Sequence, residues 1–284
     1  MNFKFSKMHH LGNDFIVVDF RPYEGENCEF ARKFDEAFSP DTVRSLCDRH
    51  FGVGADGVVG VLSPSCGKYD HKMRIINSDG SEAKMCGNGL ACFALFVSGL
   101  AKSASSAGHK VKVETLSGAR GAEIITAPHG GPKVILDMGK AEAVFSKEIS
   151  AGGRKFKAHS VSMGNPHCVI FLDEPPGAAE FRRLGPLIEN HELFPDKTNV
   201  EFVTVRSASE IDVAVWERGA GETLACGTGA SASAFTARSL KLCGDKVKVN
   251  LPGGRCAAEI KTGGRVFLEC SPVKVFEGTI TLPL

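Results

Sequence analysis

The sequence lacks a dominant charge, a long apolar run and any cysteine pair with the spacing of a zinc site. Its 284 residues carry 34 basic and 33 acidic side chains, so the formal net charge is only +1. Without a basic field, neither nucleic acid nor an anionic membrane is an expected partner. No segment approaches about 18 consecutive apolar residues, and the first residues contain no apolar core of a secretory signal. We therefore expect a cytoplasmic protein.

Cysteine is plentiful, but the patterns that usually explain it are missing. The chain has 10 cysteines and no Cys-x-x-Cys pair. The spacings between Cys243, Cys256 and Cys270, 13 and 14 residues, fit no zinc-ligand pattern. Thiols persist in a reducing compartment, so a disulfide framework is not expected. Most of these cysteines are predicted to be small buried residues. Two of them need a different explanation.

These two cysteines lie in a motif that occurs twice. Met85-Cys86-Gly87-Asn88-Gly89 is matched 140 residues later by Ala225-Cys226-Gly227-Thr228-Gly229. A strand-like run precedes each copy, and small and apolar residues follow it, which predicts a helix that begins at the motif. Nine positions before the cysteines stand Asn77 and Glu217. The duplication places one thiol in each of two similar settings.

The repeat extends beyond the cysteine motif. Asn13 and Asn165 each follow a glycine and open into an apolar run, 73 and 61 residues before the respective cysteine. A repeat this long indicates a duplicated domain and not a solenoid. The Pro/Gly cluster at 128–132 marks the expected boundary. The predicted domains are residues 1–129 together with a returning strand at 273–284, and residues 130–272.

Strand patterns dominate the rest of the chain. Alternating or β-branched runs predict strands, for example at 110–114, 133–136 and 246–251, and helices are expected at 41–49 and 177–189 besides the two at the motifs. The predicted fold is α/β, of the α+β kind. It has two pseudo-symmetric domains, each a mainly antiparallel sheet wrapped around a central helix, with the active site in the cleft between them.

A cysteine at the start of a helix has a definite chemistry. Unpaired N–H groups there bind carboxylates, and the partial positive charge lowers the pKa of a thiol. The expected carboxylate donors are the N–H groups of Gly87, Asn88, Gly227 and Thr228. If the halves face each other, one cysteine as thiolate removes an α-proton while the other as thiol protonates the opposite face. This is the chemistry of a racemase.

With these residues in view, the whole chain resembles diaminopimelate epimerase. The motifs that carry the likeness are Met8-His9-His10-Leu11-Gly12-Asn13-Asp14-Phe15, Asn77 to Glu82 with Met85 to Gly89, Gly164-Asn165-Pro166-His167-Cys168-Val169, Asn199 to Val203, and Glu217 to Thr223 with the second cysteine motif. The resemblance implies interconversion of LL- and meso-diaminopimelate in lysine and peptidoglycan-precursor synthesis. It also implies no pyridoxal phosphate, no metal and often a homodimer.

The resemblance also assigns roles to residues. It implies that Cys86 and Cys226 are the acid/base pair and that His167 and Glu217 tune the thiols. The residues implied to hold the substrate are Asn13, Asn77, Asn165, Asn199, Glu217 and Arg218. Arg218 suits a bidentate clamp on the carboxylate of a second amino-acid end. Taken singly, Arg218 is equally typical of a surface ion pair, and His167 of a buried core histidine.

Four positions depart from the family pattern. His10 stands where glycine is common, and Gly57 stands where many members have a glutamine on the substrate side. Ala91 lies where an arginine often follows the first motif. Phe276 occupies a common tyrosine position that is linked to the dimer interface. None of these departures removes a catalytic group.

Other functions fit the sequence less well. Gly52 to Gly57 fits the dinucleotide pattern G-x-G-x-x-G, but a strand pattern follows it where a helix is required. A proline- or histidine-type racemase of the same fold is the main alternative. Proline-type enzymes typically carry His where Asn88 stands, and their substrate needs no clamp by Arg218. A non-catalytic binding protein would have no reason to keep both thiols.

Overall fold

The computed structural model describes residues 2–21, 30–100, 108–126 and 131–282, and these fall into two compact units. Unit 1 comprises Met1–Leu136 and Cys270–Leu284, and unit 2 comprises Asp137–Glu269. The predicted boundary at 129/130 lies outside the described residues. The second predicted boundary, at 272/273, lies three residues after the one the structure gives, at 269/270.

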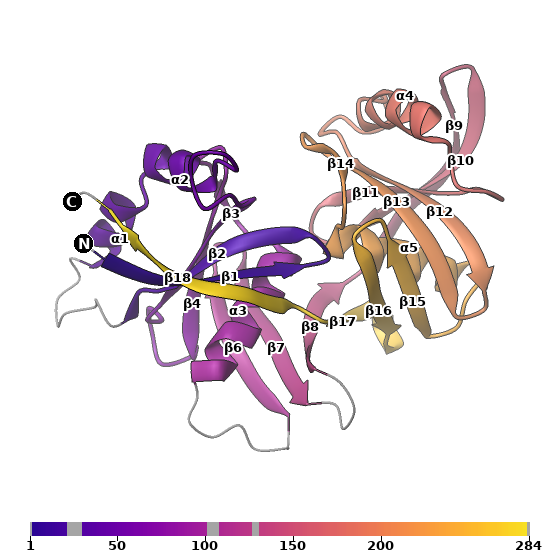
Figure 1. Cartoon of the computed structure of the whole chain (residues 1–284). Helices are drawn as coiled ribbons and strands as arrows, with labels where there is room; N and C mark the ends of the chain where they lie inside the picture. Colours follow the sequence, from indigo (N-terminus) through magenta and orange to yellow (C-terminus); the bar gives the residue numbers. More distant parts are fainter. Residues whose placement is uncertain (1, 22–29, 101–107, 127–130, 283–284) are drawn as a thin grey trace. The chain divides into compact units, whose positions relative to one another are not determined.

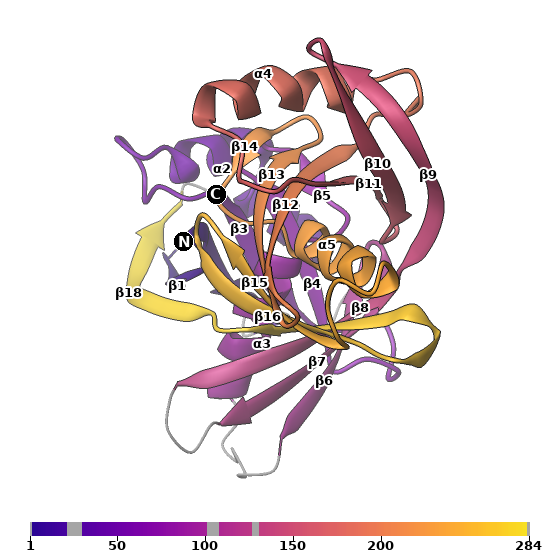
Figure 2. The same cartoon turned by 90° about the vertical axis from the view of Figure 1, so that its right-hand side faces the viewer.

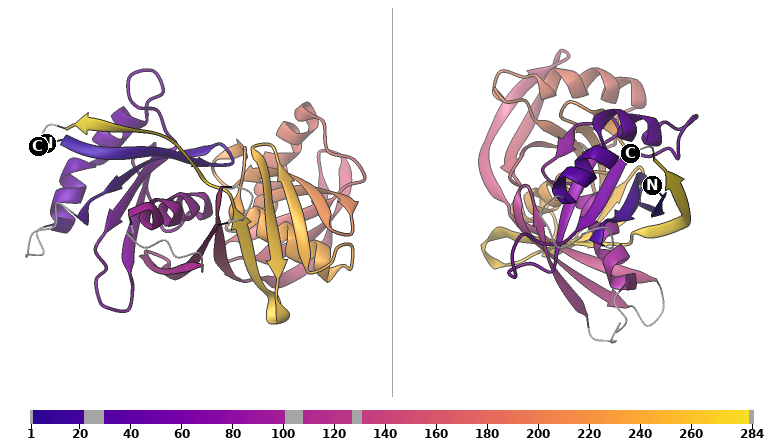
Figure 3. Two further views of the ribbon diagram at one scale, coloured as in Figure 1. Left: turned by 60° about the horizontal axis from the view of Figure 1, so that its bottom comes forward. Right: turned by 90° about the vertical axis from the view of Figure 1, so that its left-hand side faces the viewer.

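Unit 1 is a sheet with three helices (Figure 1). Its strands are β1 (Asn2–His10), β2 (Asn13–Asp19), β3 (Gly57–Leu62), β4 (His71–Asn77), β5 (Glu82–Ala83), β6 (His109–Thr115), β7 (Gly118–Thr126), the start of β8 (Pro132–Lys140), and β18 (Val273–Thr281). Its helices are α1 (Phe30–Ala37), α2 (Pro40–Cys47) and α3 (Gly87–Leu100). The C-terminal strand β18 runs antiparallel beside β1 along its length, as Figure 3 shows.

Unit 2 has the same kind of sheet and two α-helices. Its strands are β9 (Glu142–Ala151), β10 (Arg154–Ser162), β11 (Pro166–Phe171), β12 (Asn199–Ser207), β13 (Glu210–Glu217), β14 (Gly221–Thr223), β15 (Lys246–Leu251), β16 (Gly254–Ile260) and β17 (Arg265–Cys270). The helices are α4 (Ala178–Glu189) and α5 (Gly227–Ser239), and a short 3-10 turn spans Thr262–Gly264. Strand β8 begins in unit 1 and ends in unit 2.

The two units repeat one topology. In unit 1, β2 and β3 are parallel, β3, β4 and β5 are antiparallel, α3 follows, and β6 returns parallel to β4 before pairing with β7. In unit 2, strands β11 to β16 and helix α5 repeat these pairings in the same order. Each unit is thus a mainly antiparallel sheet around a central helix, and the predicted fold class is confirmed.

Alternate residues of a strand point to opposite faces of the sheet. Strands β3 and β12 are buried on both faces, whereas β6 and β15 expose one face. In unit 2, Val200 and Phe202 of β12 pack with α4, together with Phe181 and Leu184 of that helix. The alternate residues of β12 point to the other face of the sheet, toward α5. This helix contacts β10, β11, β12 and β13 (Figure 2). Unit 1 places α3 against its sheet in the same way, and α1 and α2 contribute to a phenylalanine-rich cluster that also contains Phe3 and Phe5 of β1.

The elements differ from the sequence predictions in a few places. The helix predicted at 41–49 begins one residue earlier, where Ser39 caps it, and ends at Cys47. The helix predicted at 177–189 begins at Ala178, with Gly177 as its N-cap. Helix α1, strands β1, β7 and β16, and the hairpin of β9 and β10 were not predicted. No helix among the described residues is long and apolar enough to cross a membrane.

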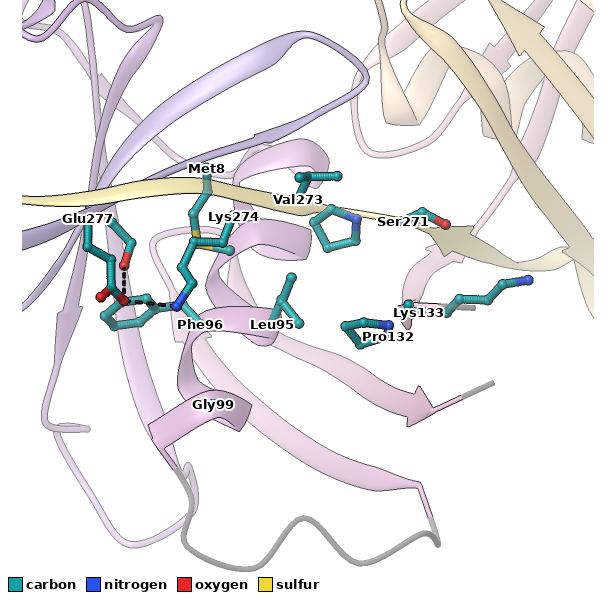
Figure 4. Close-up of a pocket in the computed structure, with 13 residues that line it drawn as sticks. Met8, Leu95, Phe96, Gly99, Pro132, Lys133, Ser271, Val273, Lys274 and Glu277 are labelled. Atoms are coloured by element: carbon teal, nitrogen blue, oxygen red, sulfur yellow. Dashed lines mark hydrogen bonds and ion pairs between the residues drawn. The ribbon is translucent and has the colours of Figure 1, made fainter. Parts of the chain in front are cut away.

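A cavity of about 650 Å³ lies beneath β18 in unit 1 (Figure 4). Met8, Leu95, Phe96 and Val273 give it an apolar wall. At its edge Lys274 donates to Glu277, with Nζ and Oε1 2.9 Å apart. None of the predicted site residues lines this cavity.

Candidate active site

In unit 1, Cys86 immediately precedes helix α3. Its sulfur accepts a hydrogen bond from the N–H of Gly89 at 3.5 Å, so the thiol lies at the helix N-terminus. The S–H also donates to Oδ1 of Asn13 at 3.7 Å. A side chain at position 89 would come within 3.0 Å of Ile75 and 3.6 Å of Phe15, which explains the glycine. The predicted helix-terminal thiol is therefore present, with Asn13 beside it.

The side-chain amides of Asn13 and Asn88, next to Cys86, form further hydrogen bonds. Asn88 donates through Nδ2 to Oδ1 of Asn13 at 3.1 Å, and Asn13 donates to Asp56 at 2.8 Å. Behind Asp56, the partly buried Asp14 accepts from Arg49 at 2.7 Å and forms an ion pair with Lys7, also at 2.7 Å. Burial opposes ionisation of Asp14, but the hydrogen bonds from Arg49 and Lys7 outweigh it and lower its pKa to about 2.

Asn77 and Gly57 face each other at the ends of β4 and β3. The amide of Asn77 donates to Oγ of Ser81 at 3.0 Å. A β-carbon at position 57 would lie 2.6 Å from the carbonyl oxygen of Ile76. The backbone of this chain therefore leaves no room for the glutamine that is common there in the family.

In unit 2, Cys226 is the N-cap of α5. Its sulfur accepts from the N–H of Gly229 at 3.4 Å and lies 3.4 Å from Oγ1 of Thr228. Burial raises the pKa of the Cys226 thiol well above its usual range, and the carboxyl groups of Glu217 and Glu201 shift it in the same direction. The expectation that the helix N-terminus lowers both thiol pKa values is thus wrong for Cys226, which stays a protonated thiol near neutral pH.

A fully buried histidine–glutamate hydrogen bond lies under Cys226. Nδ1 of His167 is 2.7 Å from Oε1 of Glu201, and neither side chain has any exposed surface. Nε2 of His167 is 3.1 Å from Oδ1 of Asn165, whose Nδ2 donates to Oγ1 of Thr228 at 3.4 Å. His167 therefore reaches Cys226 through two intervening side chains. A β-carbon at position 229 would come within 2.8 Å of Glu201, so this carboxyl group also requires a glycine beside the thiol.

Glu217 ends β13, at the place that Asn77 occupies in unit 1. Its Oε1 accepts from Oγ1 of Thr223 at 2.7 Å. Burial raises the pKa of Glu217, although the hydrogen bonds with Thr223 and with the Cys226 thiol act in the opposite direction. The carboxyl group of Glu217 thus adds to the effect of burial on the Cys226 thiol, whereas the hydrogen bond from that thiol favours the ionised form of Glu217.

The turn that follows Glu217 is stabilised by hydrogen bonds from two other segments of unit 2. Glu189, at the end of α4, accepts from Nε1 of Trp216 at 2.9 Å and from the N–H of Gly219 at 3.0 Å. Asn199 accepts from the N–H of Arg218 at 3.0 Å and donates to the carbonyl of Pro166 at 2.8 Å. These contacts fix the backbone at Arg218.

The side chain of Arg218 lies at a cavity in unit 2. Its Nη1 donates to the carbonyl of Asp196 at 3.1 Å. Arg218, Lys197 and Asn165 line the cavity, which has a volume of about 610 Å³. A guanidinium and an ammonium group at one cavity suit an anionic ligand group.

The structure therefore gathers the predicted residues into two sets. In unit 1, Asn13, Cys86 and Asn88 interact directly, and Gly87 opens the helix. In unit 2, interactions connect five of the residues in one network: Asn165, His167, Glu217, Cys226 and Thr228. Asn199 and Arg218 form a separate pair.

Two side chains that support the site, Glu201 and Glu189, were not among the predicted residues. The signal for Glu201 was a single acid in an otherwise apolar strand, Val200 to Val203. Glu189 gave no local signal, because its partners are 27 and 30 residues away in the sequence.

The structure also bears on the alternatives. The segment from Gly52 leads into strand β3, which begins at Gly57, and not into a helix. It therefore lacks the helix N-terminus that a dinucleotide pyrophosphate requires. Among the described residues, no group of three or more His, Cys, Asp or Glu side chains is arranged to hold a metal ion.

Comparisons with known proteins agree with these observations. The family profile described as diaminopimelate epimerase matches residues 5–144 and 159–276. A diaminopimelate epimerase of Methanothermobacter thermautotrophicus is 40% identical over 292 residues, covering 97% of this chain and 98% of the relative. One of Carboxydothermus hydrogenoformans is 43% identical over 287 residues, covering 97% and 98%. The crystal structure of a hydroxyproline epimerase from Agrobacterium vitis has the same fold, with a TM-score of 0.70 at 16% identity, covering 98% of this chain and 92% of that one.

Proposed function

The chain belongs to the diaminopimelate epimerase family, and we propose that it interconverts LL- and meso-2,6-diaminopimelate without a cofactor. The observation that carries the proposal is the pair of equivalent thiols. Cys86 and Cys226 stand at the N-termini of equivalent helices, and each sulfur accepts the N–H of the glycine three residues on. The N–H groups of Gly87, Asn88, Gly227 and Thr228 bind the α-carboxylate of the reacting centre.

The two thiols act as acid and base at one α-carbon. Cys226 is the protonated partner, because burial and neighbouring carboxyl groups raise its pKa. In that form Cys226 donates a proton to one face of the carbon while Cys86 removes the proton from the other. The reverse reaction exchanges these roles. The helix N–H groups stabilise the negative charge that gathers on the carboxylate as the proton leaves.

Some polar groups of unit 2 have no equivalent in unit 1. We assign them to the second amino-acid end of the substrate. Arg218 is suited to its carboxylate, and Glu217 and the asparagine oxygens are suited to ammonium groups. Asn13, Asn77, Asn165 and Asn199 complete the proposed substrate contacts. The cavity next to Arg218 and Asn165 supports this assignment of the distal end.

A substrate panel tests the proposed function. Purified protein with LL-diaminopimelate should form the meso isomer with no added cofactor, and pre-treatment with a chelator should not change the rate. Proline and histidine, offered at the same concentration, should not be turned over, because neither carries a second carboxylate for Arg218. Turnover of proline or histidine with no conversion of diaminopimelate would assign the chain to another racemase of this fold.

Assembly into a homodimer and location in the cytoplasm stay predictions from the family resemblance. One observation supports association: β18 exposes Val273, Val275 and Phe276, each about half accessible. Large apolar side chains left partly exposed on one strand are typical of a surface that another chain covers. The mass of the protein in sedimentation experiments distinguishes one copy from two.

A further inference from the structure

His10 is a buried residue next to the Cys86 site. It ends strand β1, and only 1% of its surface is exposed. Its Nδ1 lies 2.9 Å from Oδ1 of Asn88, the residue two positions after the catalytic cysteine. The family resemblance gives this position no role, because glycine is common there. The side chain is therefore a feature of this chain that calls for its own explanation.

Hydrogen-bond directions connect His10 to the thiol. Asn13 donates through Nδ2 to Asp56, so its Oδ1 is the acceptor for both the Cys86 thiol at 3.7 Å and Nδ2 of Asn88 at 3.1 Å. Asn88 therefore turns its own Oδ1 toward His10. An amide oxygen only accepts, so Nδ1 of His10 carries the hydrogen. Each of these amides thus has one orientation that fits its neighbours.

The environment of His10 favours the same neutral tautomer. Burial lowers the pKa of His10. Its other ring nitrogen, Nε2, is buried and has no hydrogen-bond partner within the described part of the chain. A ring protonated at both nitrogens would leave a buried N–H without an acceptor, which is costly. A neutral ring with its hydrogen on Nδ1 matches the oxygen of Asn88.

Unit 2 provides a parallel. There, His167 reaches Cys226 through Asn165 and Thr228, the positions equivalent to Asn13 and Asn88. His10 reaches Cys86 through the same two positions in the opposite order, from Asn88 to Asn13. The units thus each connect a buried histidine to their thiol through two polar side chains, although the histidines come from non-equivalent strands.

We propose that His10 is a positioning residue for the Cys86 half of the reaction, and this rests on the function proposed above. By donating its Nδ1 hydrogen to Asn88, His10 fixes the amides of Asn88 and Asn13 and, through Asn13, the direction of the Cys86 thiol. His10 is connected to the thiol only through Asn88 and Asn13. Its loss should disturb Cys86 and leave Cys226 unchanged.

Two substitutions at one position isolate the hydrogen bond. His10→Leu removes the donor, and His10→Asn keeps an N–H donor attached at the same point of the side chain. His159→Leu is the matched control, because His159 is a buried histidine of unit 2 that packs edge-on against Phe171 at 5.9 Å. The measurements are kcat and KM for diaminopimelate, and the rate at which iodoacetamide alkylates each cysteine, resolved by mass spectrometry.

His10→Leu should lower kcat by about 10-fold to 100-fold, the scale of loss when a reactive group is misplaced by about 1 Å. It should also change the alkylation rate of Cys86, with the rate of Cys226 unaltered in the same sample. His10→Asn should restore both quantities to near the wild-type values. His159→Leu should leave the alkylation rate of Cys86 as it is.

Two results would overturn the proposal. One is a wild-type kcat and a wild-type Cys86 alkylation rate in His10→Leu. The other is an equal change at Cys86 and Cys226, which would indicate general loosening of the fold. The alkylation measurement needs no substrate. An inactive wild-type protein would therefore refute the proposed function. The difference in the Cys86 alkylation rate between His10→Leu and His10→Asn would still test the role of His10.

Discussion

Replacing either Cys86 or Cys226 by serine should lower kcat for epimerisation by about 100-fold to 10,000-fold, the range that general acid–base groups contribute. A hydroxyl group has nearly the shape of a thiol but is a far weaker acid, so it neither forms the base nor delivers the proton at useful rates. The fold should not suffer, because serine is a favourable residue at a helix N-cap and retains the contact with the glycine N–H.

Steady-state rates in both directions and a thermal unfolding curve measure this result. Cys66→Ser is the matched control, since Cys66 is an exposed cysteine of unit 1 outside the proposed site. It should keep the wild-type rate. Near-normal epimerisation by either Cys86→Ser or Cys226→Ser would show that one cysteine is dispensable and that inversion does not use two thiols.

The second large effect concerns stability and comes from the buried pair under Cys226. His167 and Glu201 correspond in strand register to Phe15 and Val59, which are buried apolar residues of unit 1. The duplication therefore shows which apolar side chains this scaffold accepts at the two positions. Removal of one partner of a buried pair leaves an uncompensated polar group, which typically costs about 3–5 kcal/mol.

His167→Phe and Glu201→Val should each lower the free energy of unfolding by about that amount, and the double variant should recover most of the loss. Its activity should stay low, because Asn165 has lost the ring that orients it. Denaturant unfolding of all four proteins gives the coupling between the two positions. A double variant as unstable as the sum of the single variants would mean that the pair adds nothing beyond separate packing.

Most of the architecture could be predicted from local sequence patterns. The repeated cysteine motif and the glycine–asparagine segments specify turns and helix starts, so they predicted two equivalent units with a thiol at the end of each central helix. The hairpin of β9 and β10 was not predicted, because most of β9 is exposed and its sequence does not alternate between apolar and polar residues. Helix α1 is only eight residues long, too short for a clear period.

The chemistry of Cys226 could not be predicted in this way. The helix N-terminus is visible in the sequence and argues for a lowered thiol pKa. The opposing influences are burial by the folded sheet and the carboxyl groups of Glu201 and Glu217, which lie 25 and nine residues earlier in the chain. Such influences depend on which strands pack beneath the helix, so only the three-dimensional structure gives the sign of the shift.

The most direct test of two-base inversion is the hydrogen isotope at the inverted carbon during the first turnovers in D2O. The wild-type protein should convert unlabelled LL-diaminopimelate into a meso product that carries a deuterium from the solvent at that carbon, while the unreacted substrate stays unlabelled. This follows because one thiol removes the substrate proton and the other supplies a different one. A meso product that retains the original hydrogen would show that a single base carries the proton across, and would contradict the account.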